Sequence, residues 1–251
     1  MNQNDRGMID LDRILEDYRR DGVVVVRGFF DVGQVDAIRD EIARYIRDDL
    51  PSKPADARTL EADGSTVRNL WRLEQHNPFF RALAEQAETA RLVSPLVNGH
   101  AVLCGVETFN KPARIGSGVP YHQDNAYFCQ TPPDMLTVWV AIDSVTEENG
   151  PVGFLRGSHE LGMLPTRMSG VKGNSIGLAE PPKASGVAEL RVALEPGDAT
   201  IHHCQTVHHS EANHTDRPRL GLLLVYRGAH TRTDPQLQAA YDRAVATTPP
   251  A

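Results

Sequence analysis

The first hundred residues place their apolar side chains mainly at helical spacing. Between residues 10 and 20, apolar positions recur every three or four residues and stop at Gly22, which predicts a helix. A second helix is expected after Asp31, a good N-cap residue. The β-branched run 23–26 lies between them and is typical of a buried strand. The part of the chain from about 1 to 99 is therefore expected to be mainly helical, with one notable strand.

The remainder of this part alternates between polar and apolar segments. Residues 51–66 are polar and contain Pro and Gly, which predicts a loop. Two short helices are expected at about 78–88 and 88–98, where apolar residues again recur at helical spacing.

The pattern changes after Gly99, where short apolar runs are bounded by Gly, Pro or Asp. Many short strands without alternating long helices favour an antiparallel barrel or jelly roll over a doubly wound sheet. Residues 163–186 are long, polar and Gly-rich, and a loop of that length in a compact domain is usually a functional lid or a disordered segment. The predicted strands are 101–110, 135–142, 187–193, 199–203 and 220–226.

Composition narrows the class of protein. The 251 residues fit one large domain or two small ones, of which a single domain is expected, and the net charge of −7 makes nucleic acid and anionic membranes unexpected partners. The three cysteines form no Cys-x-x-Cys pair, so neither a disulfide framework nor a thiolate zinc site is expected. The polar N-terminus and the absence of an 18-residue apolar run predict a cytoplasmic protein.

One short motif carries candidate metal chemistry. His122 and Asp124 are two residues apart, and on an extended strand residues i and i+2 point to the same face. With a second histidine they would form the 2-His-1-carboxylate triad of non-haem Fe(II) oxygenases. His-x-Asp alone is a weak signal, because most occurrences of so short a motif are incidental.

The second histidine has to come from a cluster near the C-terminal end, and these residues alone do not select it. The cluster precedes Arg219, which opens an otherwise apolar strand. A guanidinium facing the interior there needs an anion, and Arg binds carboxylates bidentately, so a dicarboxylate cosubstrate is one interpretation. The alternative is that Arg219 is exposed or paired with Asp216. The candidate histidines are His202, His203, His208, His209 and His214.

Together these motifs resemble the phytanoyl-CoA dioxygenase family of Fe(II)/2-oxoglutarate oxygenases. The resemblance covers roughly residues 15–230, and its order and spacing are more specific than any single motif. The matching segments are YRRDGVVVV (18–26), NKP (110–112), HQD (122–124), Trp139, ENGP (148–151), GSH (157–159), PGD (196–198), HHS (208–210), Asn213 and Arg219.

The resemblance implies a mainly β fold, a double-stranded β-helix (jelly roll) of about 100–230, with the N-terminal helices packed on it and a C-terminal tail 231–251. It implies a metal and catalytic site of His122, Asp124 and His208, with His203 as the second choice for the last ligand. It implies that Fe(II), 2-oxoglutarate and O2 are used to hydroxylate or otherwise oxidise a small molecule, with release of succinate and CO2. The residues implied to bind 2-oxoglutarate are Arg219, Ser210, Trp139 and Lys111.

The substrate and the oligomeric state, monomer or homodimer, stay open. Arg156 replaces the proline that the family usually has before Gly-Ser-His, and His209 replaces a commoner glycine. Two other classes of function remain: a metal-binding jelly roll without catalysis, and a cupin iron oxygenase that does not use 2-oxoglutarate. The candidate substrate residues are Asn125, Tyr127, Arg68, Trp71 and Arg156.

Overall fold

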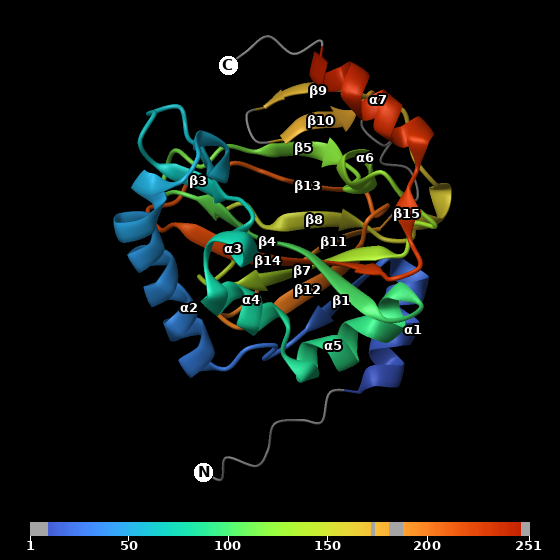
Figure 1. Ribbon diagram of the computed structural model, residues 1–251, viewed down its shortest axis with the longest axis horizontal. Helices are drawn as coiled ribbons and strands as arrows, with labels where there is room; N and C mark the ends of the chain where they lie inside the picture. Colours follow the sequence, from blue (N-terminus) through green and yellow to red (C-terminus); the bar gives the residue numbers. More distant parts are fainter. Residues whose placement is uncertain (1–9, 172–173, 181–187, 247–251) are drawn as a thin grey trace.

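Two antiparallel sheets form the centre of the computed structural model, which describes residues 10–171, 174–180 and 188–246 (Figure 1). The large sheet has the order β1 (Val23–Val26), β12 (Ala199–His203), β7 (Met135–Ala141), β14 (Arg219–Gly228), β4 (Ala101–Lys111), β3 (Val67–Leu70) and β2 (Arg58–Leu60). The small sheet has the order β11 (Glu189–Arg191), β8 (Val152–Leu155), β13 (His208–Ser210) and β5 (Val119–His122). The expected jelly roll is confirmed.

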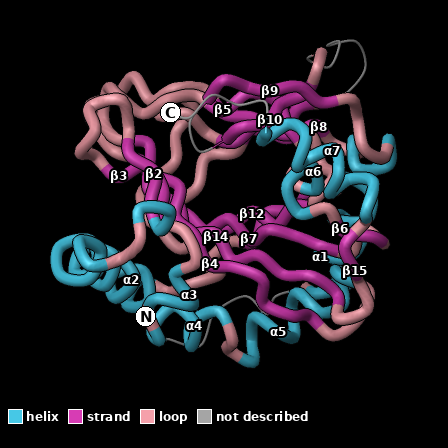
Figure 2. Tube along the Cα trace, turned by 45° about the horizontal axis from the view of Figure 1, so that its top comes forward, coloured by secondary structure: helices cyan, strands magenta, loops and turns pink. Residues whose placement is uncertain are grey.

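Helices cover one face of the large sheet (Figures 1 and 2). Ile38 and Phe80 from these helices share one buried cluster with Val138, Leu222 and Leu224 of the sheet. Burying these apolar side chains fixes the sheet against the helices, and leaves the opposite face of the sheet for a cavity. The helices are α1 (Leu11–Asp21), α2 (Val32–Arg44), α3 (Leu73–His76), α4 (Pro78–Ala84) and α5 (Ala87–Val93).

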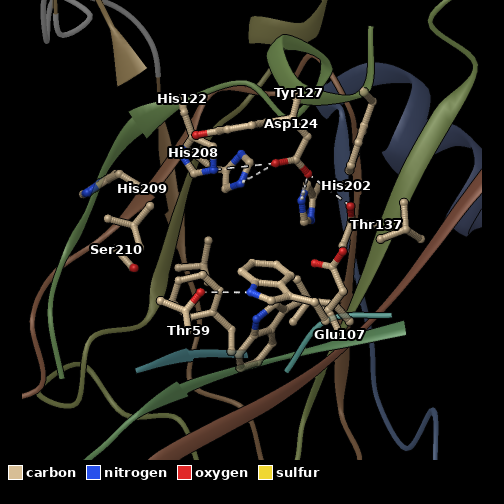
Figure 3. Close-up of a pocket in the computed structure, with 18 of the residues that line it drawn as sticks. Thr59, Glu107, His122, Asp124, Tyr127, Thr137, His202, His208, His209 and Ser210 are labelled. Atoms are coloured by element: carbon tan, nitrogen blue, oxygen red, sulfur yellow. Dashed lines mark hydrogen bonds and ion pairs between the residues drawn. The ribbon is translucent and has the colours of Figure 1, made fainter. Parts of the chain in front are cut away.

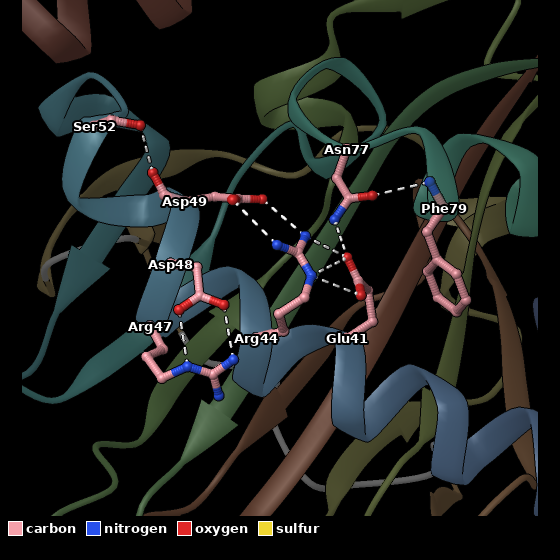
Figure 4. Close-up of polar contacts among 8 residues, drawn as sticks. All are labelled: Glu41, Arg44, Arg47, Asp48, Asp49, Ser52, Asn77 and Phe79. Carbon is pink, nitrogen blue, oxygen red and sulfur yellow. Dashed lines mark hydrogen bonds and ion pairs between the residues drawn. The ribbon is translucent and has the colours of Figure 1, made fainter.

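A polar network joins the end of α2 to the start of α4 (Figure 4). Arg44 donates to Glu41 and, through Nη2, to Asp49 Oδ2 at 2.8 Å. Asn77 donates to Glu41 Oε1 at 2.5 Å, and its Oδ1 accepts the backbone N–H of Phe79. That second bond caps α4, because a side-chain oxygen satisfies an N–H that has no partner within the helix. Charged side chains thereby hold the two helices together at the surface of the core.

The structure differs from the prediction in several segments. The expected loop 51–66 contains the edge strand β2, which pairs with β3. The expected loop 163–186 contains the hairpin β9 (Thr166–Val171) and β10 (Asn174–Leu178), and its residues 172–173 and 181–186 lie outside the described part of the chain. Within the described residues 188–193 of the strand predicted at 187–193, only 189–191 form a strand, β11. These strands are short or polar, so their apolar periodicity is weak.

The C-terminal tail is partly helical. β15 (Arg232–Thr233) pairs with β6 (Gln130–Thr131), and α7 (Pro235–Ala246) follows it and lies beside α6 (Asn125–Phe128). Figure 1 shows α7 at the same end of the molecule as the β9–β10 hairpin. None of the helices in the described ranges is long and apolar enough to cross a membrane.

Candidate active site

The two predicted histidine ligands lie opposite each other on neighbouring strands of the small sheet. His122 is the last residue of β5 and His208 the first of β13, and they are direct partners in the pairing of these strands. Their ring centroids are 4.0 Å apart. Strand register therefore brings together two residues that are far apart in the sequence.

Asp124 does not lie on the same strand as His122, although the two-residue spacing predicted that it would. The strand ends at His122, and Asp124 has helical backbone angles at the start of α6. The turn between them is held by the buried Gln123, whose amide donates to the carbonyl oxygens of Gly162 and Gln205. The expected strand geometry is wrong, although the two side chains still meet.

The three side chains nevertheless offer one compact set of ligand atoms. One ligand atom from each of His122, Asp124 and His208 lies within 4.8 Å of the other two. Asp124 Oδ1 lies 3.6 Å from His122 Nε2 and 3.5 Å from His208 Nε2 (Figure 3). A facial triad needs this convergence from one side of a metal ion.

Backbone carbonyls orient both imidazoles. His122 Nδ1 lies 2.9 Å from the oxygen of Pro120, and His208 Nδ1 lies 2.9 Å from the oxygen of Thr206. Each Nδ1 therefore carries the proton and donates it, which leaves the Nε2 lone pair free for a metal. Burial lowers the pKa of both imidazoles, so both are neutral, as metal ligands must be.

The second oxygen of Asp124 is held by two residues that the sequence did not single out for this task. Thr137 Oγ1 donates to Oδ2 over 3.1 Å, and His202 Nε2 lies 3.2 Å from the same oxygen. Burial raises the pKa of the Asp124 carboxyl, but His208, His202 and His122 outweigh it and the pKa lies well below its ordinary value. The carboxylate is therefore ionised, with Oδ1 directed at the two ligand imidazoles.

The remaining histidines of the cluster are not part of the ligand set, although His209 also lines the cavity. His203, the second choice for the ligand, packs between Tyr18 and His159 at ring distances of 6.2 and 5.4 Å. His209 contacts Glu189 over 2.5 Å, and His214 is exposed. Alternation along β12 separates His202 from His203, because neighbouring residues on a strand point to opposite faces.

Arg219 is buried in the same cavity and lacks an anionic partner among the described residues. The side chain is 1% exposed, and its Nε and Nη1 atoms make no hydrogen bond within that part of the chain. Its guanidinium lies 4.9 Å from the ring of Trp139. Burial lowers the pKa of Arg219 to about 9, so the group is still charged at neutral pH. Asp216, the alternative partner, pairs instead with Arg114 at the surface.

Trp139 occupies space that a glycine leaves open. A Cβ atom at Gly221 would lie 2.2 Å from Cζ2 of Trp139, so no other residue fits at 221 unless the indole moves. Trp139, Arg219 and Ser210 line the same cavity as the triad. The structure thus brings together three of the four residues predicted to bind 2-oxoglutarate.

Lys111, the fourth, has its ammonium group directed elsewhere. Its Nζ donates to the carbonyl oxygens of Ser117 and Glu211, each over 2.6 Å. Burial first, then Arg219 and Arg68, lowers the pKa of Lys111 to about 6. Lys111 is absent from the residues that line the cavity within the described ranges. Its contacts connect two chain segments and reach no cosubstrate position.

The cavity has a volume of about 410 Å³ and is lined by residues of both sheets. Of the predicted substrate residues, Trp71 and Tyr127 line it. Asn125 instead bonds to the backbone of Gln130, Arg68 lies near Glu61 and over Phe109, and Arg156 is exposed.

Several lining residues were missed by the sequence analysis. Glu107 and Phe109 point into the cavity from β4, whereas the buried Val106 and Thr108 alternate with them. That alternation is present in the predicted strand 101–110 and could have identified both. Tyr241 of α7 also lines the cavity, and no sequence signal placed it there.

Comparison with known families identifies the relatives of this chain. The family model of phytanoyl-CoA dioxygenase (PhyH) matches residues 18–221. A probable alpha-ketoglutarate-dependent hypophosphite dioxygenase of Stutzerimonas stutzeri is 26% identical over 85% of this chain and 77% of its own length. The ectoine dioxygenase of the same species, strain A1501, is 24% identical over 85% of this chain and 75% of its own.

Solved structures agree with the fold. The alpha-ketoglutarate-dependent epimerase SnoN from nogalamycin biosynthesis superposes with a TM-score of 0.73 and 28% identity, covering 96% of this chain and 91% of SnoN. EctD from S. alaskensis, solved with 2-oxoglutarate and 5-hydroxyectoine, has a TM-score of 0.74 at 20% identity, covering 91% and 79%. The expectation of an iron- and 2-oxoglutarate-dependent dioxygenase is confirmed. The chain belongs to the phytanoyl-CoA dioxygenase (PhyH) family.

Proposed function

We propose that this chain oxidises a small molecule with Fe(II), 2-oxoglutarate and O2, and that His122, Asp124 and His208 bind the iron. The cosubstrate's distal carboxylate would pair with Arg219, with Ser210 and Trp139 beside it. The observation that carries the proposal is the buried guanidinium of Arg219, which has no hydrogen-bond partner on Nε and Nη1 among the described residues and shares a cavity with the triad.

The donor set suits iron. Two neutral imidazoles with free Nε2 atoms and one ionised carboxylate occupy one side of a site, which leaves coordination positions for a cosubstrate and O2. A metal-binding module without catalysis would not need Arg219, because burying a guanidinium without an anion is costly. An iron oxygenase that does not use 2-oxoglutarate would leave the same charge unpaired.

The protein's own contribution is to bind, orient and exclude water. Pro120 and Thr206 fix the imidazole tautomers, Thr137 and His202 fix Asp124, and the aromatic walls limit water in the cavity. Bound Fe(II), 2-oxoglutarate and O2 supply oxidative decarboxylation to succinate and CO2 together with removal of a substrate hydrogen. One oxygen atom is expected in the substrate product and the other in succinate.

The experiment is a substrate screen that reads succinate in the presence of Fe(II), 2-oxoglutarate and O2, with His208→Ala beside the matched control His203→Ala. His208→Ala should abolish turnover and weaken Fe(II) binding, whereas His203→Ala should retain both, because His203 lies between Tyr18 and His159. Activity and full iron occupancy in His208→Ala would remove that residue from the ligand set.

The mass of the product tests the outcome of the reaction. We propose hydroxylation or a related oxidation, and not halogenation, because Asp124 supplies a carboxylate where a halide would otherwise bind. A gain of one oxygen, or a loss of two hydrogens, is expected even in saturating chloride. An unchanged mass with exchange of one hydrogen would indicate the outcome named for SnoN, an epimerase.

We also propose that the substrate is a small metabolite and that the protein acts in the cytoplasm. Ectoine, in the names of several relatives, supports the first point. Fractionation of cells that produce the tagged chain would test the second, with membrane or secreted fractions as the contrary result.

A further inference from the structure

A glutamate projects into the cavity from an apolar part of the large sheet. Glu107 lies on β4 opposite Leu223 of β14, with Gly105 and Phe109 two residues away on the same face of its strand. Figure 3 shows its carboxyl group directed into the same space as Thr137. None of Gly105, Phe109 and Leu223 has a side-chain hydrogen-bond donor, so the register gives this acid no partner.

No hydrogen bond or ion pair connects Glu107 to the residues that the structure describes. Two other glutamates nearby show the usual arrangement: Glu74 Oε2 accepts the backbone N–H of Val106 over 2.7 Å, and Glu61 Oε2 accepts from Ser117 Oγ over 3.0 Å. A half-buried carboxyl group without a partner is costly. Burial first, then the charges of Asp124 and Glu74, raises the pKa of Glu107 to about 8, and the smaller opposing effect of the Arg72 charge does not offset them.

The cavity wall near such an acid suits a cation. Trp71, Phe109 and Tyr241 line the cavity, and aromatic faces attract ammonium groups. Thr59, another lining residue, already accepts the indole N–H of Trp71. Among the described lining residues, Asp124 and Glu107 carry the carboxyl groups and Arg219 the guanidinium group, and Asp124 and Arg219 are assigned to iron and 2-oxoglutarate.

We propose that Glu107 recognises the substrate by pairing with a basic nitrogen, so that the substrate is an amine-bearing molecule held between this carboxylate and the aromatic walls of the cavity. The inference rests on the proposed function, because that function assigns Asp124 and Arg219 to other ligands. A buried acid and a protonated amine compensate each other's loss of water, and the pair fixes which part of the substrate faces the triad.

The test measures binding of matched amines and alcohols to protein loaded anaerobically with Fe(II) and 2-oxoglutarate. The probe pairs are 2-phenylethylamine with 2-phenylethanol, and tryptamine with tryptophol, titrated by calorimetry and by ligand-observed NMR. In the unmutated protein at least one amine should bind about tenfold or more tightly than its alcohol. Equal affinities in both pairs, or no binding of either amine, would overturn the proposal.

The preference should depend on the charge at position 107. Glu107→Gln keeps the size and a hydrogen-bonding amide but cannot pair with an ammonium group, so the preference for the amine should fall to about threefold or less. Glu107→Leu, which matches the apolar Leu223 beside it, should fold and show the same loss. Glu147→Gln makes the same change at an exposed position and should keep the preference.

A preference that survives in Glu107→Gln shows that a neutral hydrogen bond, and not an ion pair, recognises the ligand, which contradicts the proposal. Failure of the inference is separable from failure of the proposed function, because the loading step itself measures 2-oxoglutarate binding. Protein that binds 2-oxoglutarate without preferring amines contradicts the inference alone. Protein that prefers amines through Glu107 without binding 2-oxoglutarate contradicts the proposed function alone.

Discussion

Lys111 and Arg219 are direct partners across β4 and β14, yet the regions around their charged groups differ. Both side chains are almost fully buried, at 0% and 1% exposure. The Lys111 Nζ donates to the carbonyl oxygens of Ser117 and Glu211, whereas Arg219 has two nitrogens without a partner in the described chain. A buried basic group that bonds to the backbone supports the fold, and one left without partners in a cavity is available for a ligand.

The largest expected effect tests the Arg219 side of this comparison. Arg219→Met should raise the apparent KM for 2-oxoglutarate by about tenfold to about a hundredfold, because a hydrogen bond to a charged group contributes about 1.5–3 kcal/mol. The free energy of unfolding without ligands should not fall, since the variant removes an unpaired buried charge. Steady-state kinetics and urea unfolding check both statements, and an unchanged KM would exclude Arg219 as the anchor.

The next effect tests the Lys111 side. At about pH 10, where protonation of the unfolded lysine no longer penalises the folded protein, Lys111→Met should lower the free energy of unfolding by about 2 kcal/mol, because two carbonyl groups lose their donor. The apparent KM for 2-oxoglutarate should change much less than in Arg219→Met. If Lys111→Met instead left the stability intact and raised that KM by a comparable factor, the two residues would share one role.

The Lys111 side of the comparison also depends on pH. The pKa of Lys111 is lowered to about 6, whereas an unfolded lysine has a pKa of about 10.4. Between about pH 6 and about pH 10.4, Lys111 is protonated in the unfolded chain but not in the folded protein. Burial of Lys111 therefore lowers the free energy of unfolding by its full amount below about pH 6, and this loss disappears as the pH rises toward about 10.4. The unfolding free energy of the unmutated protein, relative to Lys111→Met, should therefore rise from pH 6.5 to pH 9 in urea titrations. A flat difference would show that the carbonyl contacts keep the ammonium charged throughout.

The smallest effect is expected at a cation that is neither buried nor free. Arg114 pairs with Asp216 at the surface, where both side chains are 72% exposed. Arg114→Ala should change the free energy of unfolding by less than about 1 kcal/mol, as is usual for exposed pairs. The KM for 2-oxoglutarate should not move. A large change in the free energy of unfolding or in the KM would show that exposure does not explain why Arg114 differs from Lys111 and Arg219.

The comparison also shows what the sequence could and could not reveal. Arg219 was predicted because a charge opens an apolar strand, and burial is readable from that pattern. Lys111 was assigned to 2-oxoglutarate because it lies in a family motif, but its partners are carbonyl groups of residues 117 and 211. Every residue type has a backbone carbonyl group, so partners of this kind cannot be identified from the sequence. Lys111 and Arg219 could therefore not be distinguished before the fold was known.

The triad illustrates the same limit. Spacing alone left five histidines open, and the family order selected His208, which the structure places beside His122. Asp124 was expected on the strand and instead lies in the turn just before α6, since this turn is held by long-range contacts of Gln123. The central strands were predictable from their apolar runs, whereas the polar hairpin β9–β10 and the helix α7 were not.

Gly221 has a consequence for how this enzyme can diversify. Because the indole of Trp139 fills the space beside its Cα, variation at this point of β14 is excluded by steric overlap and not by a missing attraction. Directed evolution of new substrate preferences should therefore find few tolerated changes on this strand around residue 221. Adaptive substitutions are expected to accumulate on the neighbouring strand β4 and on α7, where Glu107, Phe109 and Tyr241 reach the cavity.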